Sequence, residues 1–238
     1  MAAQVGESGR GLALVKDSSK VLVSVAVGIG FVVALFVPAA LSGYPGIPSG
    51  QYSPYGGTMA AQGQSIQMSQ AVQMMRGVPP DAHVIPSNNT IVFGGSSVKL
   101  VVLATDLEGA ANLTSNAPPG YASDNVFVIY GLINPTLVVS RGATLQMAFV
   151  NLDGGDYHNF AISTTPPPYP YMAMQGMMNW QQQGIVQMMP FLPPASYAQG
   201  VAHEYPYSVT LSTQTSLWYL CTYPGHAQMG MYGEVLVN

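Results

Sequence analysis

The sequence predicts an all-β sandwich or barrel that follows one N-terminal transmembrane helix and a flexible linker. An uncharged apolar run near the N-terminus predicts the helix. A stretch rich in Gly, Pro, Ser and Gln comes next and is typical of a linker. From about residue 90 onward, short β-rich runs separated by Gly, Pro and Asn predict the sandwich or barrel, with strands expected to pair antiparallel.

The apolar run at residues 21–41 is a predicted membrane anchor. It contains no charged residue, and about 20 apolar residues are enough to cross the hydrocarbon core as a helix. Three basic residues lie in the tail formed by residues 1–20, and the next one is Arg76, so we expect the tail in the cytoplasm and the rest of the chain outside. A cleaved signal peptide is the alternative, but its apolar core usually has about 7 to 15 residues.

Few residues of this chain are charged. The charged fraction is 7%, against about 25% in ordinary soluble domains. Six Lys and Arg residues cannot neutralise a phosphate backbone, so nucleic acid is not an expected partner. Three basic and eight acidic residues follow Gly43, and a surface that titrates so little resists acid, which predicts an acidic exterior. Glycosylation is the alternative explanation, because Asn88 and Asn112 begin Asn-x-Thr sequons.

Residues 42–86 form the predicted linker, and the apolar spacing within residues 65–76 allows one short packing helix there. Residues 87–238 form the predicted β-domain. Its expected strands begin at Thr90, Ser97, Asn125, Thr136, Thr144, His158, Tyr207, Ser216 and Tyr232. A Pro- and Met-rich insert at about 165–205 interrupts them, and we expect it to be a large irregular loop with one helical turn.

Four scarce side chains form a candidate metal site. Cys221, His226 and Met231 follow one another in the spacing C-x4-H-x4-M after a predicted strand, and His158 begins another strand. Two imidazoles and one thiolate with a weak axial thioether hold copper in a geometry that suits both Cu(I) and Cu(II). Little then has to move when an electron arrives, so this ligand set is typical of electron transfer.

Each of these residues also has an ordinary structural explanation. A lone Cys is usually a small buried apolar residue, a lone His is often a hydrogen-bonded surface residue, and a Met can fill a core. Four of them in this order are hard to explain by packing alone. Met229 competes with Met231 for the axial position, where the reach of the loop favours Met231. His83 and His203 have no assigned role.

The stretch Cys221 to His226, with the sequence CTYPGH, resembles the ligand loop of azurin-type blue copper proteins. The C-x4-H-x4-M spacing resembles the rusticyanins and, more closely, the membrane-anchored archaeal sulfocyanins. This resemblance, which covers about residues 90 to 238 and the anchor, implies a cupredoxin-like Greek-key domain. It also implies one type 1 copper ion on His158, Cys221 and His226 with Met231 axial. The insert at 165–205 departs from the small cupredoxins.

The resemblance and the chemistry together predict the surroundings of the copper ion. Asn159 resembles the asparagine that ties the two ligand loops together near Thr222, and such outer hydrogen bonds commonly matter about 10 to 100-fold in affinity or activity. Phe160, Trp218 and Tyr223 are expected around the thiolate, where an apolar shell favours the reduced state and raises the reduction potential.

The resemblance implies electron transfer at an archaeal cell surface, from an upstream donor and toward a terminal oxidase. The alternative is copper storage or delivery through thioethers of the insert: Met172, Met174, Met177, Met178, Met188 and Met189. A copper enzyme is the least favoured class, because it needs a second copper site or an open coordination position and few histidines remain. We therefore expect neither an enzyme nor a small-molecule substrate.

Overall fold

The computed structural model describes residues 63–174, 184–213 and 215–238. Its elements in chain order are β1 (Gln64–Gln67), α1 (Met68–Arg76), β2 (Ala82–Ile85), the 3-10 helix η1 (Pro86–Asn88), β3 (Thr90–Phe93), β4 (Ser97–Asp106), α2 (Leu107–Leu113), β5 (Asn125–Ile129), β6 (Leu132–Ile133), β7 (Thr136–Val139), β8 (Ala143–Asn151), β9 (Ala161–Ser163), β10 (Ile185–Met188), β11 (Val201–Leu211), β12 (Thr215–Leu220) and β13 (Tyr232–Val237). No helix among these residues is long and apolar enough to cross a membrane. The predicted tail and anchor, residues 1–20 and 21–41, lie outside the described residues.

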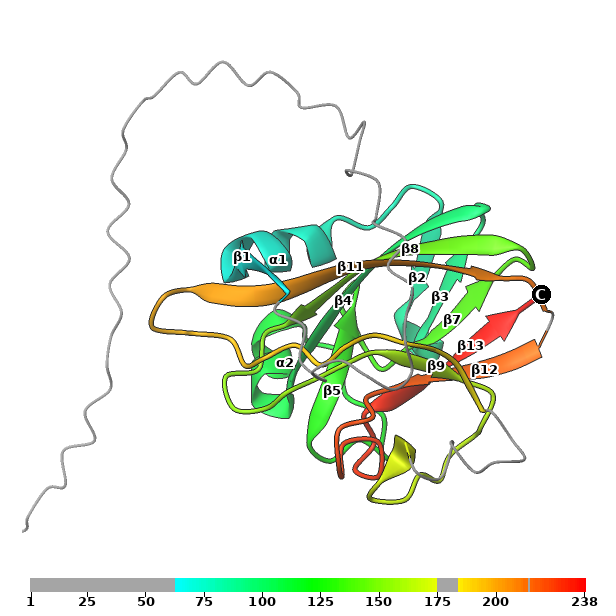
Figure 1. The fold of residues 1–238 in the computed structure, drawn as a ribbon. Coiled ribbons are helices and arrows are strands. Elements are labelled where there is room, and N and C mark those ends of the chain that lie inside the picture. Colours follow the sequence, from blue (N-terminus) through cyan, green and yellow to red (C-terminus); the bar gives the residue numbers. More distant parts are fainter. Residues whose placement is uncertain (1–62, 175–183, 214) are drawn as a thin grey trace, which may run out of the picture. The chain divides into compact units, whose positions relative to one another are not determined.

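The described strands form two sheets, as the sequence predicts for a β-sandwich (Figure 1). A six-stranded sheet has the order β1-β11-β8-β4-β5-β6, and a seven-stranded sheet has the order β10-β9-β12-β13-β7-β3-β2. The predicted strands at Thr90, Ser97, Asn125, Thr136 and Tyr232 begin where the structure begins them.

The expectation of purely antiparallel pairing is wrong. β4 pairs with β8, β3 with β7, and β7 with β13 in parallel. Among the described strands, the chain passes from the seven-stranded to the six-stranded sheet from β3 to β4, from β7 to β8 and from β10 to β11, and the first two of these crossings decide the parallel pairs β3·β7 and β4·β8. These two crossings lie side by side and run in the same direction, so their strands meet in parallel in both sheets.

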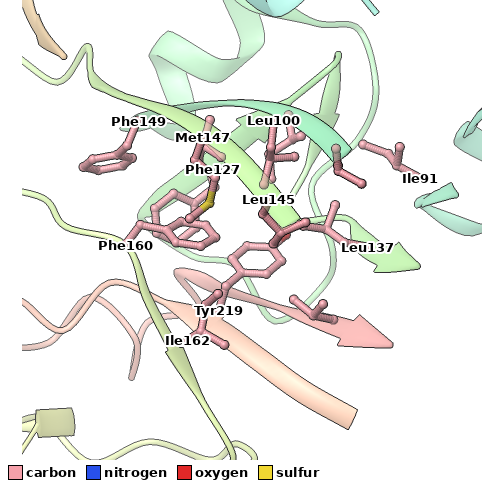
Figure 2. Packing of buried hydrophobic residues seen from close by; sticks show 14 of the residues in the cluster. Ile91, Leu100, Phe127, Leu137, Leu145, Met147, Phe149, Phe160, Ile162 and Tyr219 are labelled. Atoms are coloured by element: carbon pink, nitrogen blue, oxygen red, sulfur yellow. The ribbon is translucent and has the colours of Figure 1, made fainter. Parts of the chain in front are cut away.

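Aromatic side chains fill the space between the sheets (Figure 2). Phe127 lies edge-on to Phe149, Phe160 and Tyr219, and the rings of Phe160 and Tyr219 stack with centroids 5.1 Å apart. Tyr219 is completely buried, and its hydroxyl donates a hydrogen bond of 2.6 Å to the carbonyl of Pro135. This core continues without a break to Cys221 and Met231 at one end of the sandwich.

The β-domain begins before residue 87, within the segment that was predicted to be a linker. The predicted short helix is present as α1, but β1 pairs with β11 and β2 pairs with β3, so residues 64–85 belong to both sheets. α1 and α2 pack on the outer face of the six-stranded sheet, where Met75 and Ala110 are buried. The sequence does not indicate β1 and β2, because each has only four residues and the stretch has few charged residues and much Gly and Pro.

The insert is also more regular than predicted. It contains β10, which pairs with β9 at the edge of the seven-stranded sheet, and the first residues of β11. The whole of β11 pairs with β8 over nine residues. Proline and methionine interrupt the apolar and polar alternation here, so no strand pattern is visible in the sequence. Residues 175–183 of the insert lie outside the described residues.

Candidate metal centre

The three strongest ligand candidates come from two segments at one end of the sandwich. Cys221 directly follows β12, on which Leu217 and Tyr219 already face the core, so the alternation along the strand turns the thiol inward. His158 lies between β8 and β9, and its backbone pairs with Leu192 through two hydrogen bonds of 3.2 and 2.8 Å. His226 follows in the turn after Cys221.

The structure brings these three side chains together. The Sγ atom of Cys221 lies 3.7 Å from Nδ1 of His158 and 3.5 Å from Nδ1 of His226, and the two Nδ1 atoms are 3.2 Å apart. Among the described residues, these three form the group of His, Cys, Asp or Glu side chains that could hold a metal ion. Imidazole and thiolate ligands lie about 2.0 to 2.3 Å from a bound transition-metal ion, so three of them around one ion are about 3.5 Å apart. The three donor atoms therefore have separations that would fit a single ion.

Met231 is positioned at the same end of the core. Its side chain is completely buried, its amide donates to the carbonyl of His226 (2.9 Å), and its carbonyl accepts from the amide of Cys221 (3.1 Å). Met229 is only partly buried, and its carbonyl accepts from Ser123. Burial and loop connectivity favour Met231 over Met229, and its axial role stays a prediction.

Asn159 ties the two ligand-bearing segments together, as predicted. Its amide nitrogen donates to the Thr222 hydroxyl (2.9 Å), and its amide oxygen accepts from the backbone amide of Thr222 (2.8 Å). Asn159 is completely buried, and these bonds join the residue after His158 to the residue after Cys221. The distance between the two ligands is therefore fixed by the folded chain.

A loop before His158 supplies partners that the sequence analysis missed. Asp153 Oδ2 lies 3.3 Å from the outer nitrogen, Nε2, of His158, and Asp153 Oδ1 accepts from the amides of Gly155 (2.6 Å) and Asp156 (3.1 Å). Asp156 Oδ2 lies 3.8 Å from Nε2 of His226, and Asn125 Nδ2 lies 3.3 Å from the same atom. The signal in the sequence is the run Asp-Gly-Gly-Asp at 153–156, which places two carboxylates close before a ligand.

These contacts change the proton affinity of the site. Burial raises the pKa of the Cys221 thiol, but hydrogen bonds from His158 and His226 outweigh it and lower the pKa to about 6. Burial lowers the pKa of His158, but hydrogen bonds to Asp153 and Cys221 raise it to about 9. Burial also raises the pKa of Asp153, and its hydrogen bond with His158 then holds that pKa below its usual value. The thiol is therefore poised to ionise and bind a metal ion.

The apolar surroundings are partly as predicted. Phe160 is buried in the same core as Cys221, and Tyr223 packs against that core. Trp218 is not part of this core and is only partly buried. It alternates with Leu217 and Tyr219 along β12, so its side chain points to the other face of the sheet.

The remaining histidines do not join the site. His83 is exposed on β2, at the edge of its sheet. His203 lies on β11 opposite Asn151, and its Nδ1 atom is buried without a hydrogen-bond partner.

Four methionines of the insert lie among the described residues: Met172, Met174, Met188 and Met189. Met189 is buried in the main core, the sulfur of Met188 accepts from the Thr222 hydroxyl at 3.8 Å, and Met172 is 37% exposed. Met177 and Met178 lie outside the described residues.

Comparisons with known proteins agree with this geometry. Rusticyanin from Acidithiobacillus ferridurans is 28% identical over 152 residues, which cover 64% of this chain and 69% of that protein. A rusticyanin from Acidithiobacillus ferrooxidans has the same identity over 83% of its length. The solved rusticyanin from Thiobacillus ferrooxidans is 26% identical with a TM-score of 0.57, and the alignment covers 74% of this chain and 96% of that one. A structure of rusticyanin variants has a TM-score of 0.58, 25% identity, and coverage of 76% of this chain and 100% of that one.

This chain is a blue copper protein with the cupredoxin fold. No protein-family model matches the chain. The donor set of His158, Cys221 and His226 fits one type 1 copper ion. Rusticyanins and other cupredoxins are electron-transfer proteins and not enzymes, so this blue copper protein is an electron carrier that exchanges electrons with partner proteins.

Proposed function

We propose that this cupredoxin is a membrane-anchored carrier in the respiratory chain of an acidophilic archaeon, related to the sulfocyanins. It passes single electrons from an upstream donor to a terminal oxidase. Residues 21–41 anchor it in the cell membrane, with residues 1–20 in the cytoplasm and the copper domain outside. The uncharged apolar run, the position of the basic residues and the low charge of the outer part support this proposal.

The convergence of three buried donor atoms on one point carries the electron-transfer assignment. Copper bound there supplies a one-electron couple between Cu(I) and Cu(II). Cys221 would provide the thiolate, His158 and His226 would provide Nδ1, and Met231 would provide a thioether. Asn159 holds the two ligand segments at a fixed separation, and Asp153 and Asp156 face the outer nitrogens of the histidines. A pocket held in this way changes little between the two oxidation states.

Spectroscopy of the copper-loaded full-length protein in detergent tests the copper assignment. We expect an intense visible charge-transfer band from thiolate to copper, one copper per chain, and loss of the band in Cys221→Ser. Met231→Gln should lower the reduction potential and keep the colour, while Met229→Gln should leave both unchanged. A colourless copper-loaded wild type contradicts the assignment, and two or more tightly bound copper ions per chain favour storage or delivery.

Protease treatment of intact cells tests the topology. We expect the domain after Gly43 to be cleaved and residues 1–20 to be protected, and the reverse pattern contradicts the proposed orientation. Reduction of a terminal oxidase in the same membranes by the prereduced protein tests the respiratory role. Oxidase turnover that does not depend on this protein contradicts it.

A further inference from the structure

Two asparagines in Asn-x-Thr sequons take no part in the copper site. Asn88 is the last residue of the 3-10 helix η1, and Asn112 lies in the last turn of α2. Both are exposed. This motif accepts an N-linked sugar where the chain lies outside the cell. Since both acceptors are exposed, their hydrogen bonds decide which of them is available.

The Asn88 sequon is free of contacts to distant parts of the fold. The side-chain amide of Asn88 makes no hydrogen bond with any other described residue. Asn89 turns the chain back with a φ of 51° and a ψ of 47°, and the Thr90 hydroxyl then donates to the carbonyl of Asn88 at 3.1 Å. The turn therefore holds the hydroxyl that the motif requires beside the acceptor residue.

The Asn112 sequon is tied to its surroundings. Nδ2 of Asn112 donates to the carbonyl of Glu108 within α2 at 3.1 Å. The Thr114 hydroxyl donates to the carbonyl of Gly131 (2.6 Å) and accepts from the amide of Asn116 (3.1 Å). A transferase would have to break these bonds before it could use this sequon. The folded protein therefore offers Asn88 and withholds Asn112.

The Asn88 loop adjoins an unprotected edge of the seven-stranded sheet. β2 ends the sheet and pairs with β3 over four residue pairs in unbroken register. It contains neither lysine nor proline, which often block pairing at such an edge, and Ile85 at its end is 36% exposed. β10, at the other edge, has a register irregularity, which also hinders pairing. Among the described strands of this sheet, β2 is therefore the one most open to pairing with another chain.

The outer part of the chain has little charge to keep molecules apart. Three basic residues follow Gly43, and in an acidic exterior the carboxyl groups become neutral. Repulsion between molecules, which helps to keep proteins soluble, then depends on these few residues and on the histidines. A glycan is bulky and hydrated, so it adds solubility without depending on charge.

We propose that Asn88 is an N-glycosylation site of the folded protein, and that its glycan shields the free edge of β2 from other chains. Asn112 stays unmodified. The proposal rests on the outside location of the domain in the proposed function and adds a modification to it. A glycan at the tip of the β2–β3 hairpin lies next to the edge that has no other protection.

The reaction is a glycosyl transfer from a lipid-linked oligosaccharide. A bond forms between Nδ2 of Asn88 and the anomeric carbon of the sugar, and the bond from that carbon to the lipid phosphate breaks. The side-chain amide loses one proton, and the phosphate oxygen leaves with the bonding electron pair. No oxidant or reductant is needed.

Mass spectrometry of the full-length protein from its native membranes tests the modification. Trypsin cleaves after Lys and Arg, so Asn88 and Asn112 lie in separate peptides, 77–99 and 100–141. We expect peptide 77–99 to carry the mass of a glycan and peptide 100–141 to have its unmodified mass. Equal modification of both peptides overturns the selection of Asn88 by the fold.

Variants of the sequon assign the added mass to Asn88. Asn88→Gln and Thr90→Ala should lose it, and Thr90→Ser should keep it, because the motif accepts serine or threonine. Asn112→Gln is the matched control and should keep it. An unmodified wild-type peptide 77–99, in a protein whose domain protease cleaves on intact cells, overturns the glycan while the proposed orientation stands. Protection of the domain from that protease overturns the orientation itself.

Light scattering of the full-length protein in detergent at pH 3 tests the shielding role. We expect Asn88→Gln and Thr90→Ala to lose solubility several-fold with an unchanged visible copper band, and Asn112→Gln to behave like the wild type. Adding Ile85→Lys to Asn88→Gln should restore solubility, because a lysine at the edge blocks strand pairing. Wild-type solubility of Asn88→Gln, or no rescue by Ile85→Lys, overturns the shielding role.

Discussion

At the scale of single residues, the outer nitrogens of the two histidines distinguish this site. Nε2 of His158 faces the buried carboxylate of Asp153, and Nε2 of His226 faces the half-exposed carboxylate of Asp156. A carboxylate hydrogen-bonded to a ligand imidazole fixes the ring and makes it a stronger electron donor to the metal. Negative charge at this distance also favours the oxidised ion, against the effect of the apolar core around Cys221.

Replacing Asp153 by Asn tests whether the charge of Asp153 lowers the reduction potential against the effect of the apolar core. The amide oxygen can still accept from Gly155 and Asp156, but the charge beside His158 is lost. We expect the reduction potential to rise and copper affinity to fall about tenfold, measured by redox titration and by competition with a chelator. Asp156→Asn is the comparison and should have a smaller effect on the potential, because its oxygen is farther away and more exposed. An unchanged potential in Asp153→Asn contradicts the electrostatic role.

Copper affinity should depend on pH in two regimes. The pKa of Cys221 is about 6 and that of His158 about 9, so between these values the thiol is ionised while His158 carries a proton that copper must displace. We expect affinity to rise about tenfold per pH unit between about 6 and 9, and more steeply below about 6, where the thiol also binds a proton. Isothermal titration in buffers of different ionisation enthalpy measures the released protons. A single slope from pH 5 to 9 contradicts this pairing.

The same two shifts both stabilise the metal-free protein, but their contributions change with pH in opposite directions. The raised pKa of His158 contributes stability below its unfolded value of about 6.5, and this is lost as the pH rises toward 9. The lowered pKa of Cys221 contributes stability above its unfolded value of about 9, and this is lost as the pH falls through about 6. Between about 6.5 and 9 the loss from His158 and the gain from Cys221 offset each other, so their summed contribution changes little with pH.

The sequence predicts the ligands better than it predicts their surroundings. Cys221, His226 and Met231 lie within one loop, so their spacing alone brings them together, and Asn159 is adjacent to His158. Asn125 could not be predicted, because it reaches His226 only through the pairing of β5 with β4. The expectation that Trp218 lies at the thiolate is wrong. Trp218 is close to Cys221 in the sequence, but side chains alternate along β12, so Trp218 points to the other face of the sheet.

At the scale of elements, the turn between His226 and β13 positions Met231. Gly230 has a φ of +100°, and a Cβ atom there would overlap the backbone of Tyr121 and lie 2.7 Å from Ala122 Cα. Its carbonyl accepts a buried hydrogen bond of 2.8 Å from the side chain of Asn134. Glycine is therefore required for the chain to reach Met231 from His226.

Gly230→Ala should lower the free energy of unfolding by at least about 2 kcal/mol, through backbone strain and overlap. It should also shift the reduction potential, because the loop that carries Met231 must move. Gly120→Ala is the control, since no other atom lies within 4 Å of a Cβ added there. Urea denaturation and redox titration measure both effects. A Gly230→Ala protein with wild-type stability contradicts this account.

The strands were predictable where apolar residues alternate and breakers flank them, as in β3 and β13. The parallel pairs were not, because alternation has the same period in parallel and antiparallel strands and only the crossings between sheets decide direction. β1 and β10 were missed for another reason. Each has four residues and lies at a sheet edge, and the sequence around them is rich in Gln, Gly and Met.

At the scale of the whole molecule, acid tolerance depends on whether folding raises or lowers the pKa of each carboxyl group. Asp153 has a lowered pKa, so its contribution to stability is present at higher pH and is lost as the pH falls through its folded-state pKa. Glu204 on β11 is 8% exposed, and its burial raises its pKa above 4.5. The folded state therefore holds the proton of Glu204 more tightly than the unfolded chain does. This group favours folding in acid, and its contribution is lost as the pH rises through the folded-state pKa.

Glu204→Gln should therefore raise the free energy of unfolding at pH 7, where it removes a buried charge, and leave it nearly unchanged at pH 3, where the glutamate is already neutral. Glu234→Gln on β13, at a less buried position, should change neither value. Urea denaturation of the metal-free protein at the two pH values measures the effect. Copper is left out because its binding would stabilise the folded state by mass action and add to the free energy of unfolding. Equal changes at both pH values would show that packing, and not ionisation, governs this position.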